Sequence, residues 1–320
     1  MKKRTGIFLT AALILSACGN PASDQTVQAD RPSVIAIVKA MDSLHWLSVE
    51  EGLDQAALQS GVDLNVLWPD EEDDVETQKR MIQDAVTAKP DALILAPCDS
   101  AQVQPYIQEL QAQGTKLLYM DEEGGDRSGI PYVGSDNYHA GELAAEKLAE
   151  SLPEAAKVAV IAGSQSQMAH QKRAGGFTDY IEKNTSLQVV SVKEVPGTTL
   201  AGGRKAMQEI LEEDPDVAGV FCASAMLVMG ALENNEATGR TEIRLVGMDT
   251  QSDALSALEN GKILAMISQN GYEIGYTALL QAVSSLEGTE VPEKTYVSNE
   301  VITKETADTF LQKYVSEGRS

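Results

Sequence analysis

The stretch "KLLYMDEEGG" (residues 116–125) joins a short apolar run to three consecutive acids and two glycines. A run of this length and composition is typical of a buried β-strand. Asp121, Glu122 and Glu123 therefore stand where a strand leaves the protein core. Acids at such a position either lie in a solvated loop or line a binding site, and the rest of the chain decides between these two interpretations.

The same pattern, a short apolar run followed by an amphipathic segment, repeats along the chain from residue 33. Residues 75–88 place apolar side chains at helical spacing, and they follow a predicted strand at 63–68. Strands that are apolar throughout are expected where helices cover both faces of a parallel sheet. The other predicted strands are 34–38, 91–97, 115–121, 157–163, 187–195, 217–224, 243–249 and 263–269, and further predicted helices are 47–60, 101–113 and 138–151.

The predicted strands form two successive sets of about five, with helices between them. This organisation predicts an α/β fold with two similar doubly wound parallel-sheet domains of the Rossmann-like type. Ligands of such open sheets bind outside the carboxyl ends of the strands. Strand ends from both halves carry small, polar or acidic residues, including "YMDEE" (119–123) and "GMDTQ" (247–251). We therefore expect one cleft shared by the two domains, with the acids of the opening stretch at its edge.

The N-terminus has the features of a secretory signal. "MKKRTGIFLTAALILSAC" (1–18) contains a basic start, an apolar run too short to span a membrane, and small residues before Cys18. Its end resembles the bacterial lipobox, which implies that the Cys18 thiol is lipidated and becomes the new N-terminus; an ordinary signal peptide is the alternative. We expect a signal peptide over 1–17, a lipid-anchored flexible tether over 18–32, and an extracytoplasmic location at the cell envelope.

The chain is strongly acidic, with 48 acidic and 25 basic residues and a formal net charge of −23. Such a chain repels phosphate backbones and anionic lipid surfaces, so nucleic-acid binding is not expected. Its length of 320 residues is consistent with two domains.

The sequence contains no motif of a nucleophile and base, no Walker A motif and no paired C-x-x-C, and we expect neither catalysis nor a cofactor. The acidic run "DEEDDVE" (70–76) lacks the spacing of a Ca²⁺ loop and predicts a solvated helix start. The Gly-rich segment 197–203 predicts a loop that enters a helix. The three histidines lie far apart in sequence and give no zinc motif. Cys98 and Cys222 are expected to be buried or half-buried thiols, although the location permits a disulfide.

Several motifs, in this order and spacing, resemble the type I periplasmic sugar-binding proteins, the ribose-binding-like group, over roughly residues 34–302. They are "VIAIVKAMDSLHWLSVEEG", "DALILAPCDS", "YMDEE", "YVGSDNYHAGELAAEKL", "RAGGF", "DPDVAGVFCASAMLVMGAL" and "LVGMDTQSDALSALENGKILAMISQNGYEIG". The resemblance implies two domains that close on a ligand between them. It also implies three hinge crossovers, near 135–137, 269–270 and 298–300.

The family's domain plan transfers to this chain by position. The first domain would comprise residues 33–135 plus 270–298, and the second 136–269 plus 299–320. The ligand would lie between these two domains.

Family pocket positions near the first strand fall on four residues here. The aromatic pair of the family corresponds to His45 and Trp46, and an indole offers a flat apolar face to sugar C–H groups. Asp42 and Ser43 match a position where the family often has Asn, and either side chain can bind a hydroxyl. In the second domain, Ser224 occupies a position where ribose-type proteins usually have Asn.

Acids and amides at the other pocket positions would bind ligand hydroxyls. Asp121 matches the family's Asp after the fourth strand, and Asp249 matches the second-domain Asp. An ionised carboxylate accepts several hydroxyl hydrogen bonds, and such charge-assisted bonds are stronger than neutral ones. Gln269 matches the hinge Gln. Gln171 and Arg173 both fall near a family Arg, with an ambiguity between the two positions.

Glu122 is the largest departure from the family pattern, because many relatives have Arg directly after the Asp. An ionised Glu only accepts hydrogen bonds, so ribose itself is not the expected ligand. One alternative is a donor-rich ligand such as a polyol or an amino sugar. A second is that Glu122 turns toward Arg173, Lys172 or Lys39 across the cleft. A third is that Glu122 and Glu123 point to solvent.

A narrower resemblance concerns the binding proteins for the furanosyl autoinducer. These use a Lys, an Asp and a Gln in the cleft and an Ala in the second domain. Lys39, Asp121, Gln171 and Ala225 fall near those positions, whereas a second Asp and a Pro of that motif have no clear match.

The resemblance implies a monomeric, lipid-anchored substrate-binding protein of an ABC importer, partnered by a permease and an ATPase, for a monosaccharide or related polyhydroxy compound. A ligand sensor that docks on a signalling receptor is the alternative, and the same cleft serves both functions. The effector domain of a transcription repressor is disfavoured by the signal sequence and by the lack of a DNA-binding module. A hydrolase has no supporting motif.

Overall fold

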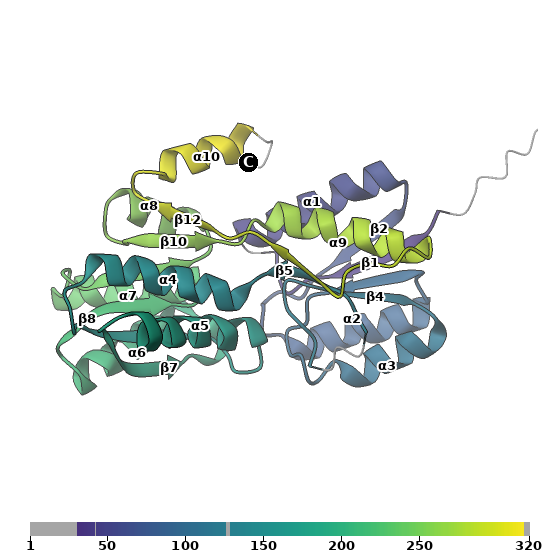
Figure 1. Cartoon of the computed structure of the whole chain (residues 1–320). Coiled ribbons are helices and arrows are strands. Elements are labelled where there is room, and N and C mark those ends of the chain that lie inside the picture. The colour runs from purple at the N-terminus through teal and green to yellow at the C-terminus, as the bar shows by residue number, and fades with distance from the viewer. Residues whose placement is uncertain (1–30, 42, 126–128, 317–320) are drawn as a thin grey trace, which may run out of the picture. The chain divides into compact units, whose positions relative to one another are not determined.

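The structure is a computed structural model in which residues 31–41, 43–125 and 129–316 are described. It is built from two β-sheets flanked by helices (Figure 1). Four sequence predictions lie outside the described residues, namely the signal peptide 1–17, Cys18, the tether up to Asp30, and Asp42.

In the described part of the chain, each sheet contains six strands. The strands are β1 (Ser33–Ile37), β2 (Asp63–Leu67), β3 (Ala92–Leu95), β4 (Lys116–Met120), β5 (Tyr132–Ser135), β6 (Lys157–Ala162), β7 (Gln188–Glu194), β8 (Val217–Cys222), β9 (Arg244–Met248), β10 (Ala265–Ser268), β11 (Lys294–Val297) and β12 (Glu300–Thr303). The first sheet has the order β11-β5-β4-β3-β1-β2, and the second has the order β12-β10-β9-β8-β6-β7. The two orders are equivalent, so the same unit is built twice, as the sequence predicted. We call the halves around these sheets the first lobe and the second lobe.

Helices cover both faces of each sheet. They are α1 (Leu44–Ser60), α2 (Val75–Ala88), α3 (Gln104–Gln113), α4 (Asn137–Ser151), α5 (Met168–Asn184), η1 (Pro196–Thr198), α6 (Leu200–Glu213), α7 (Ala225–Thr238), α8 (Ser252–Glu259), α9 (Gly271–Leu286) and α10 (Ala307–Ser316). In the first lobe, α1 and α9 cover one face of the sheet while α2 and α3 cover the other. In the second lobe, α4 and α5 lie on one face while α6, α7 and α8 lie on the other.

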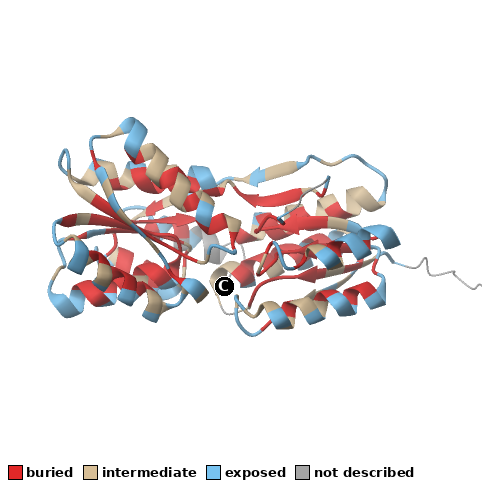
Figure 2. Cartoon of the chain, turned by 90° about the horizontal axis from the view of Figure 1, so that it is seen from below, coloured by how far each residue is buried: buried red, intermediate tan, exposed pale blue. Residues whose placement is uncertain are grey.

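The strands are apolar throughout because successive side chains enter different cores. In β3, Ile94 packs into the core beneath α1 and α9, while Leu93 and Leu95 pack into the core beneath α2 and α3. Figure 2 shows the buried residues along the strands and the inner faces of the helices. The edge strand β7 differs from the prediction, since its residues alternate between exposed and partly buried. A sheet edge has a neighbour on one side only, and the helices do not cover it fully.

The chain passes between the lobes at three places, between β5 and α4, between β10 and α9, and between β11 and β12. The strands β5, β11 and β12 were not identified from the sequence. Each has only four residues, and β5 reads "YVGS", which is a weak strand signal. One pairing is antiparallel, that of β12 with β10, because the chain returns directly from the neighbouring lobe.

Close packing of α4 against α5 depends on glycine. A Cβ atom on Gly141 would overlap the carbonyl oxygen of Arg173, and a Cβ on Gly176 would overlap the carbonyl oxygen of Tyr138. These obstructing atoms belong to the backbone and cannot rotate away. The two glycines therefore fix the distance between α4 and α5, the helix that carries several residues of the site described below.

Both cysteines in the described residues are buried free thiols, as expected from the sequence. Burial raises the pKa of Cys98 to about 12, and it also raises the pKa of Cys222. No helix in the described part of the chain is both long enough and apolar enough to cross a membrane.

Candidate functional site

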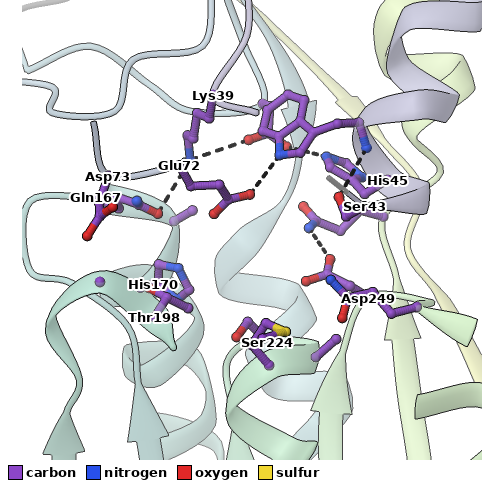
Figure 3. A pocket seen from close by; sticks show the side chains of 18 of the residues that line it. Lys39, Ser43, His45, Glu72, Asp73, Gln167, His170, Thr198, Ser224 and Asp249 are labelled. Carbon is purple, nitrogen blue, oxygen red and sulfur yellow. Dashed lines mark hydrogen bonds and ion pairs between the residues drawn. The ribbon is translucent and has the colours of Figure 1, made fainter. Parts of the chain in front are cut away.

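A cavity of about 380 Å³ lies between the two lobes, at the carboxyl ends of the strands (Figure 3). Both lobes contribute to its lining. Eight of the predicted site residues line this cavity, namely Ser43, His45, Trp46, Asp121, Arg173, Ser224, Asp249 and Gln269. The shared cleft inferred from the polar strand ends is therefore present.

Two other predicted site residues do not line the cavity. Gln171 is exposed, and its amide nitrogen donates to the Gln165 carbonyl oxygen. Two positions along an α-helix correspond to a rotation of about 200°, so Gln171 and Arg173 cannot both face the cavity. Arg173 is the one that does. Glu122 is buried and is not among the residues that line the cavity.

Asp121 and Asp249 occupy equivalent places in the two lobes. Each follows the last residue of a strand, β4 for Asp121 and β9 for Asp249, and both strands have the same position in their sheets. Both residues have left-handed backbones, with φ of 62° and 70°. This conformation is uncommon for residues other than glycine, and it persists where the surroundings enforce it. Two carboxylates, one from each lobe, are thereby held at the cavity.

Lys39 balances the acids that follow β4. Its Nζ lies 3.3 Å from Glu122 Oε2 and 3.6 Å from Asp121 Oδ2, and it is 4% exposed. Burial alone would lower the pKa of Lys39, but the Glu122 and Asp121 carboxylates outweigh it and raise that pKa above its usual value. Nζ also donates to Gln167 Oε1 at 3.4 Å. Lys39 thus joins the first lobe to the start of α5 in the second lobe.

Glu122 caps a helix of the opposite lobe. Its Oε1 accepts a hydrogen bond from the Ala169 backbone N–H at 3.1 Å, in the first turn of α5. The residue at the usual capping position, Gln167, makes no side-chain capping bond. A carboxylate at a helix N-terminus interacts favourably with the helix dipole. Of the three alternatives for Glu122, the structure contains the one in which it faces Lys39.

The solvent alternative for the two glutamates is wrong. Glu122 is 1% exposed and Glu123 is 3% exposed, and each contacts residues of both lobes. Glu123 forms an ion pair with Lys172 on α5 and another with Lys294 at 3.6 Å. The acids of the opening stretch therefore have two tasks, since Asp121 lines the cavity while Glu122 and Glu123 hold the lobes together.

His45 and Trp46 approach the cavity from the first turn of α1. His45 Nε2 lies 2.9 Å from Asp121 Oδ1. Burial alone would lower the pKa of His45, but the Asp121 carboxylate raises it. Burial alone would raise the pKa of Asp121, but the hydrogen bond with His45 and the charge of Lys39 outweigh burial and hold that pKa well below its usual range. Ser43 lines the cavity and also caps α1, since its hydroxyl accepts from the Trp46 N–H.

An acidic loop contributes residues that the sequence analysis missed. The run 70–76 was expected to be a solvated helix start, and Asp74 does cap α2 by accepting from the Thr77 N–H at 2.9 Å. Glu72, however, lines the cavity and accepts from the indole N–H of Trp46 at 2.7 Å. Asp73 also lines the cavity. This loop follows β2, so the rule that identified Asp121 at a strand end would have found these acids too.

The second lobe adds two nitrogen-bearing side chains from α5. Arg173 donates to Asn137 Oδ1 at 2.8 Å and to the Ala223 carbonyl oxygen at 3.0 Å. His170 was not predicted. It is 4% exposed, and its Nδ1 has no hydrogen-bond partner in the described structure. Burial and the charges of Arg173 and Lys39 hold the pKa of His170 well below its usual value, so the ring is neutral.

The loop 196–199 also reaches the cavity through Gly197, Thr198 and Thr199. The segment 197–203 was predicted as a loop that enters a helix, and α6 in fact begins within it, at Leu200. Within the described residues no group of three or more His, Cys, Asp or Glu side chains is arranged to hold a metal ion. The cavity presents hydrogen-bonding groups and charges, and the Trp46 ring, which is 1% exposed, lies at its lining.

Known proteins resemble this chain in both sequence and structure. A family model described as "Periplasmic binding protein domain" matches residues 34–290. The ribose import binding protein RbsB of Bacillus subtilis is 28% identical over 301 residues, covering 91% of this chain and 95% of that protein. The D-apiose import binding protein of Actinobacillus succinogenes is 26% identical over 265 residues, covering 82% of this chain and 84% of that protein.

A solved structure shows the same likeness. The glucose-galactose binding protein GanP of Geobacillus stearothermophilus superposes with a TM-score of 0.82 at 29% identity, covering 86% of this chain and 98% of the GanP chain. The likeness extends over both lobes, because it covers nearly the whole described chain.

Proposed function

Since the chain belongs to the periplasmic binding protein domain family, we propose that it is the extracytoplasmic substrate-binding protein of an ABC importer. Its ligand is a monosaccharide or a related polyhydroxy compound, bound between the lobes. The observation that carries this proposal is the pair of carboxylates, Asp121 and Asp249, held at one cavity by equivalent strand ends of the two lobes.

The chemistry of the cavity supports a polyhydroxy ligand. Carboxylates accept hydroxyl hydrogen bonds, and Arg173 and Ser224 can donate to ligand oxygens. Trp46 supplies an apolar surface beside these polar groups. A small number of placed polar groups around an apolar face is the usual composition of a small-molecule site.

Capture proceeds by hinge closure. The first lobe, 33–135 plus 270–298, moves against the second lobe, 136–269 plus 299–320, about the three crossovers. The contacts of Lys39 with Gln167 and of Glu122 with Ala169 join the lobes and stabilise the closed arrangement. A lipid on Cys18 anchors the protein at the membrane, where a permease and an ATPase take over the ligand.

A thermal-shift panel tests this proposal. The purified protein is mixed with pentoses, hexoses, polyols and amino sugars, and with amino acids as non-sugar controls. A ligand at 100 times its dissociation constant adds about 2.7 kcal/mol to the free energy of unfolding. We expect at least one sugar or polyol to raise the melting temperature, and the Asp249→Asn variant to lose that shift. A panel in which only amino acids stabilise the protein, or nothing does, contradicts the proposal.

A further inference from the structure

One wall of the cavity carries acceptors whose charges are not balanced. Glu72 and Asp249 both point into the cavity from opposite lobes (Figure 3). The side chains that line the cavity and can carry a positive charge are Lys39, His45 and Arg173, and each bonds to groups other than Glu72 and Asp249; Arg173 donates to Asn137 and to the Ala223 carbonyl oxygen. Lys39 pairs with Asp121 and Glu122, and His45 pairs with Asp121. Within the described residues, Glu72 and Asp249 therefore have no ion-pair partner.

Gln269 adds a third acceptor to this wall. Its amide nitrogen donates to Asp249 Oδ1, and because a carboxylate can only accept, this bond fixes the orientation of the amide. The other amide atom, Oε1, is an acceptor with no donor in the described structure, although Gln269 is only 6% exposed and lines the cavity. A buried acceptor without a donor is costly, so a donor from the ligand is expected here.

The lining residues of α5 have a different character. Arg173 brings a guanidinium that donates to an amide oxygen and a backbone carbonyl oxygen, and neighbouring His170 is neutral, with an Nδ1 that has no hydrogen-bond partner in the described structure. These groups suit the hydroxyl and ring oxygens of a sugar. The two groups of residues therefore suit different parts of one ligand. The α5 side chains suit a part that is rich in oxygen atoms, and the acceptors Glu72, Asp249 and Gln269 suit a part that is rich in hydrogen-bond donors.

We propose that the ligand is an amine-bearing polyhydroxy compound, of the amino-sugar class, whose ammonium group is bound by Glu72, Asp249 and the Gln269 Oε1 atom. This inference rests on the proposed function and names its substrate class. An ammonium group has three donors and no acceptor, whereas a hydroxyl has one donor. It also supplies a positive charge to two half-buried carboxylates that have no ion-pair partner in the described residues, and charge-assisted bonds are about twice as strong as neutral ones.

The partial burial of Glu72 agrees with this assignment. Burial raises the pKa of Glu72, as do the charges of Asp121 and Asp249, and only Lys39 and the Trp46 hydrogen bond act in the other direction. A bound ammonium group would lower that pKa again. The amino-sugar alternative raised from the sequence rested on Glu122, which the structure instead pairs with Lys39; a different set of acceptors carries the inference here.

Matched sugar pairs test the inference. Titration calorimetry compares glucosamine with glucose and galactosamine with galactose at pH 7, using the N-acetyl derivatives as uncharged controls. We expect the amine to bind about tenfold or more tightly than its parent, which corresponds to about 1.4 kcal/mol. The N-acetyl derivative should lose this advantage, because its amide carries no charge.

Two variants separate direct contact from general charge. Glu72→Gln keeps an acceptor for the Trp46 indole but removes the charge, and it should reduce the ratio of amine to parent affinity about tenfold. Asp70→Asn removes one charge from an exposed residue of the same loop that does not line the cavity. That control should leave the ratio unchanged.

The outcomes distinguish this inference from the proposed function. Parent sugars that bind as tightly as their amines, with a ratio that Glu72→Gln does not change, overturn the amine assignment and leave a sugar-binding protein. Equal losses in Glu72→Gln and Asp70→Asn also overturn it, since they indicate a long-range effect. If no sugar of the hexose pairs or of the wider panel binds, both the inference and the proposed function fail.

Discussion

Replacing Lys39 with Met tests the buried charge network at the base of the site. The substitution keeps a long apolar stem but removes the ammonium group that lies 3.3 Å from Glu122 and 3.6 Å from Asp121. Lys39 and Glu122 are 4% and 1% exposed, so solvent does not compensate for the loss. Removing one partner of a buried ion pair typically costs about 3–5 kcal/mol of the free energy of unfolding.

The lower end of that range is expected for Lys39→Met. Glu122 is covered partly by the second lobe, through its bond to the Ala169 N–H, and separation of the lobes would hydrate it. Asp121 lies in the same lobe as Lys39 and retains its contact with His45. We therefore expect a destabilisation of about 3 kcal/mol for Lys39→Met.

Urea unfolding measures this cost by linear extrapolation. Glu122→Gln retains an acceptor for the Ala169 N–H and removes the unpaired charge. The double variant Lys39→Met/Glu122→Gln should therefore be more stable than the sum of the single effects predicts, with a coupling of about 1–3 kcal/mol. A loss below about 1 kcal/mol for Lys39→Met, or strict additivity in the double variant, would refute the reasoning about this network.

Two further predictions concern packing and pH. Gly176→Ala should destabilise the protein by about 1–3 kcal/mol, because its Cβ overlaps a backbone carbonyl oxygen, whereas Gly175→Ala meets no atom within 4 Å and should add up to about 1 kcal/mol through helix propensity. His45→Asn should cost about 1.5–3 kcal/mol at pH 6 and less at pH 9. The pKa of His45 is raised above 6.5, so its contribution is complete below that pH and disappears as the pH rises through the raised value.

Urea melts of these variants, with wild type measured at both pH values, provide the test. Equal effects of the two glycine substitutions would contradict the account of the α4–α5 contact. A cost for His45→Asn that grows as the pH rises would contradict the assignment of the charged pair with Asp121. The pKa of Asp121 is lowered in the folded protein. Its contribution to stability is therefore present above the ordinary pKa of an aspartate and is lost only as the pH falls through the lowered pKa.

The strands and the polar strand ends could be predicted because each depends on a local pattern. The run 91–97 is apolar throughout, and β3 is buried on both faces. Asp121 and Asp249 directly follow such runs, and parallel strands bring their carboxyl ends to one edge, which predicted a cleft there; the family resemblance then assigned these two acids to the ligand. Both residues line the cavity.

Contacts between separate elements could not be predicted in the same way. Glu122 caps α5 of the other lobe, and no local pattern says which helix start meets a given strand end. The solvated alternative for Glu122 was reasonable for an acid in a run of acids before glycines, and it failed because Lys39 and the Ala169 N–H of the second lobe bind the buried carboxylate. His170 was missed for a related reason, since only the helix orientation decides which residues of α5 face the cavity.

The acidic loop shows a limit of composition as evidence. Five acids in 70–74 suggested solvation, and some of them, such as Asp70 and Glu71, are indeed exposed. Glu72 lines the cavity and accepts a hydrogen bond from the indole N–H of Trp46, a residue 26 positions away in sequence. A run of charged residues therefore predicts that a segment is mostly solvated, but it does not predict which of its side chains enter a site.

Titration calorimetry of the tightest-binding sugar against wild type, Asp121→Asn and Asp249→Asn tests the central claim most directly. A ligand bound between the lobes requires one site per chain and contacts with an acid from each lobe. We predict a stoichiometry of one and an affinity loss of tenfold or more, about 1.4 kcal/mol, in both variants. A sugar that binds with full affinity to either variant would contradict binding between the lobes at this cavity.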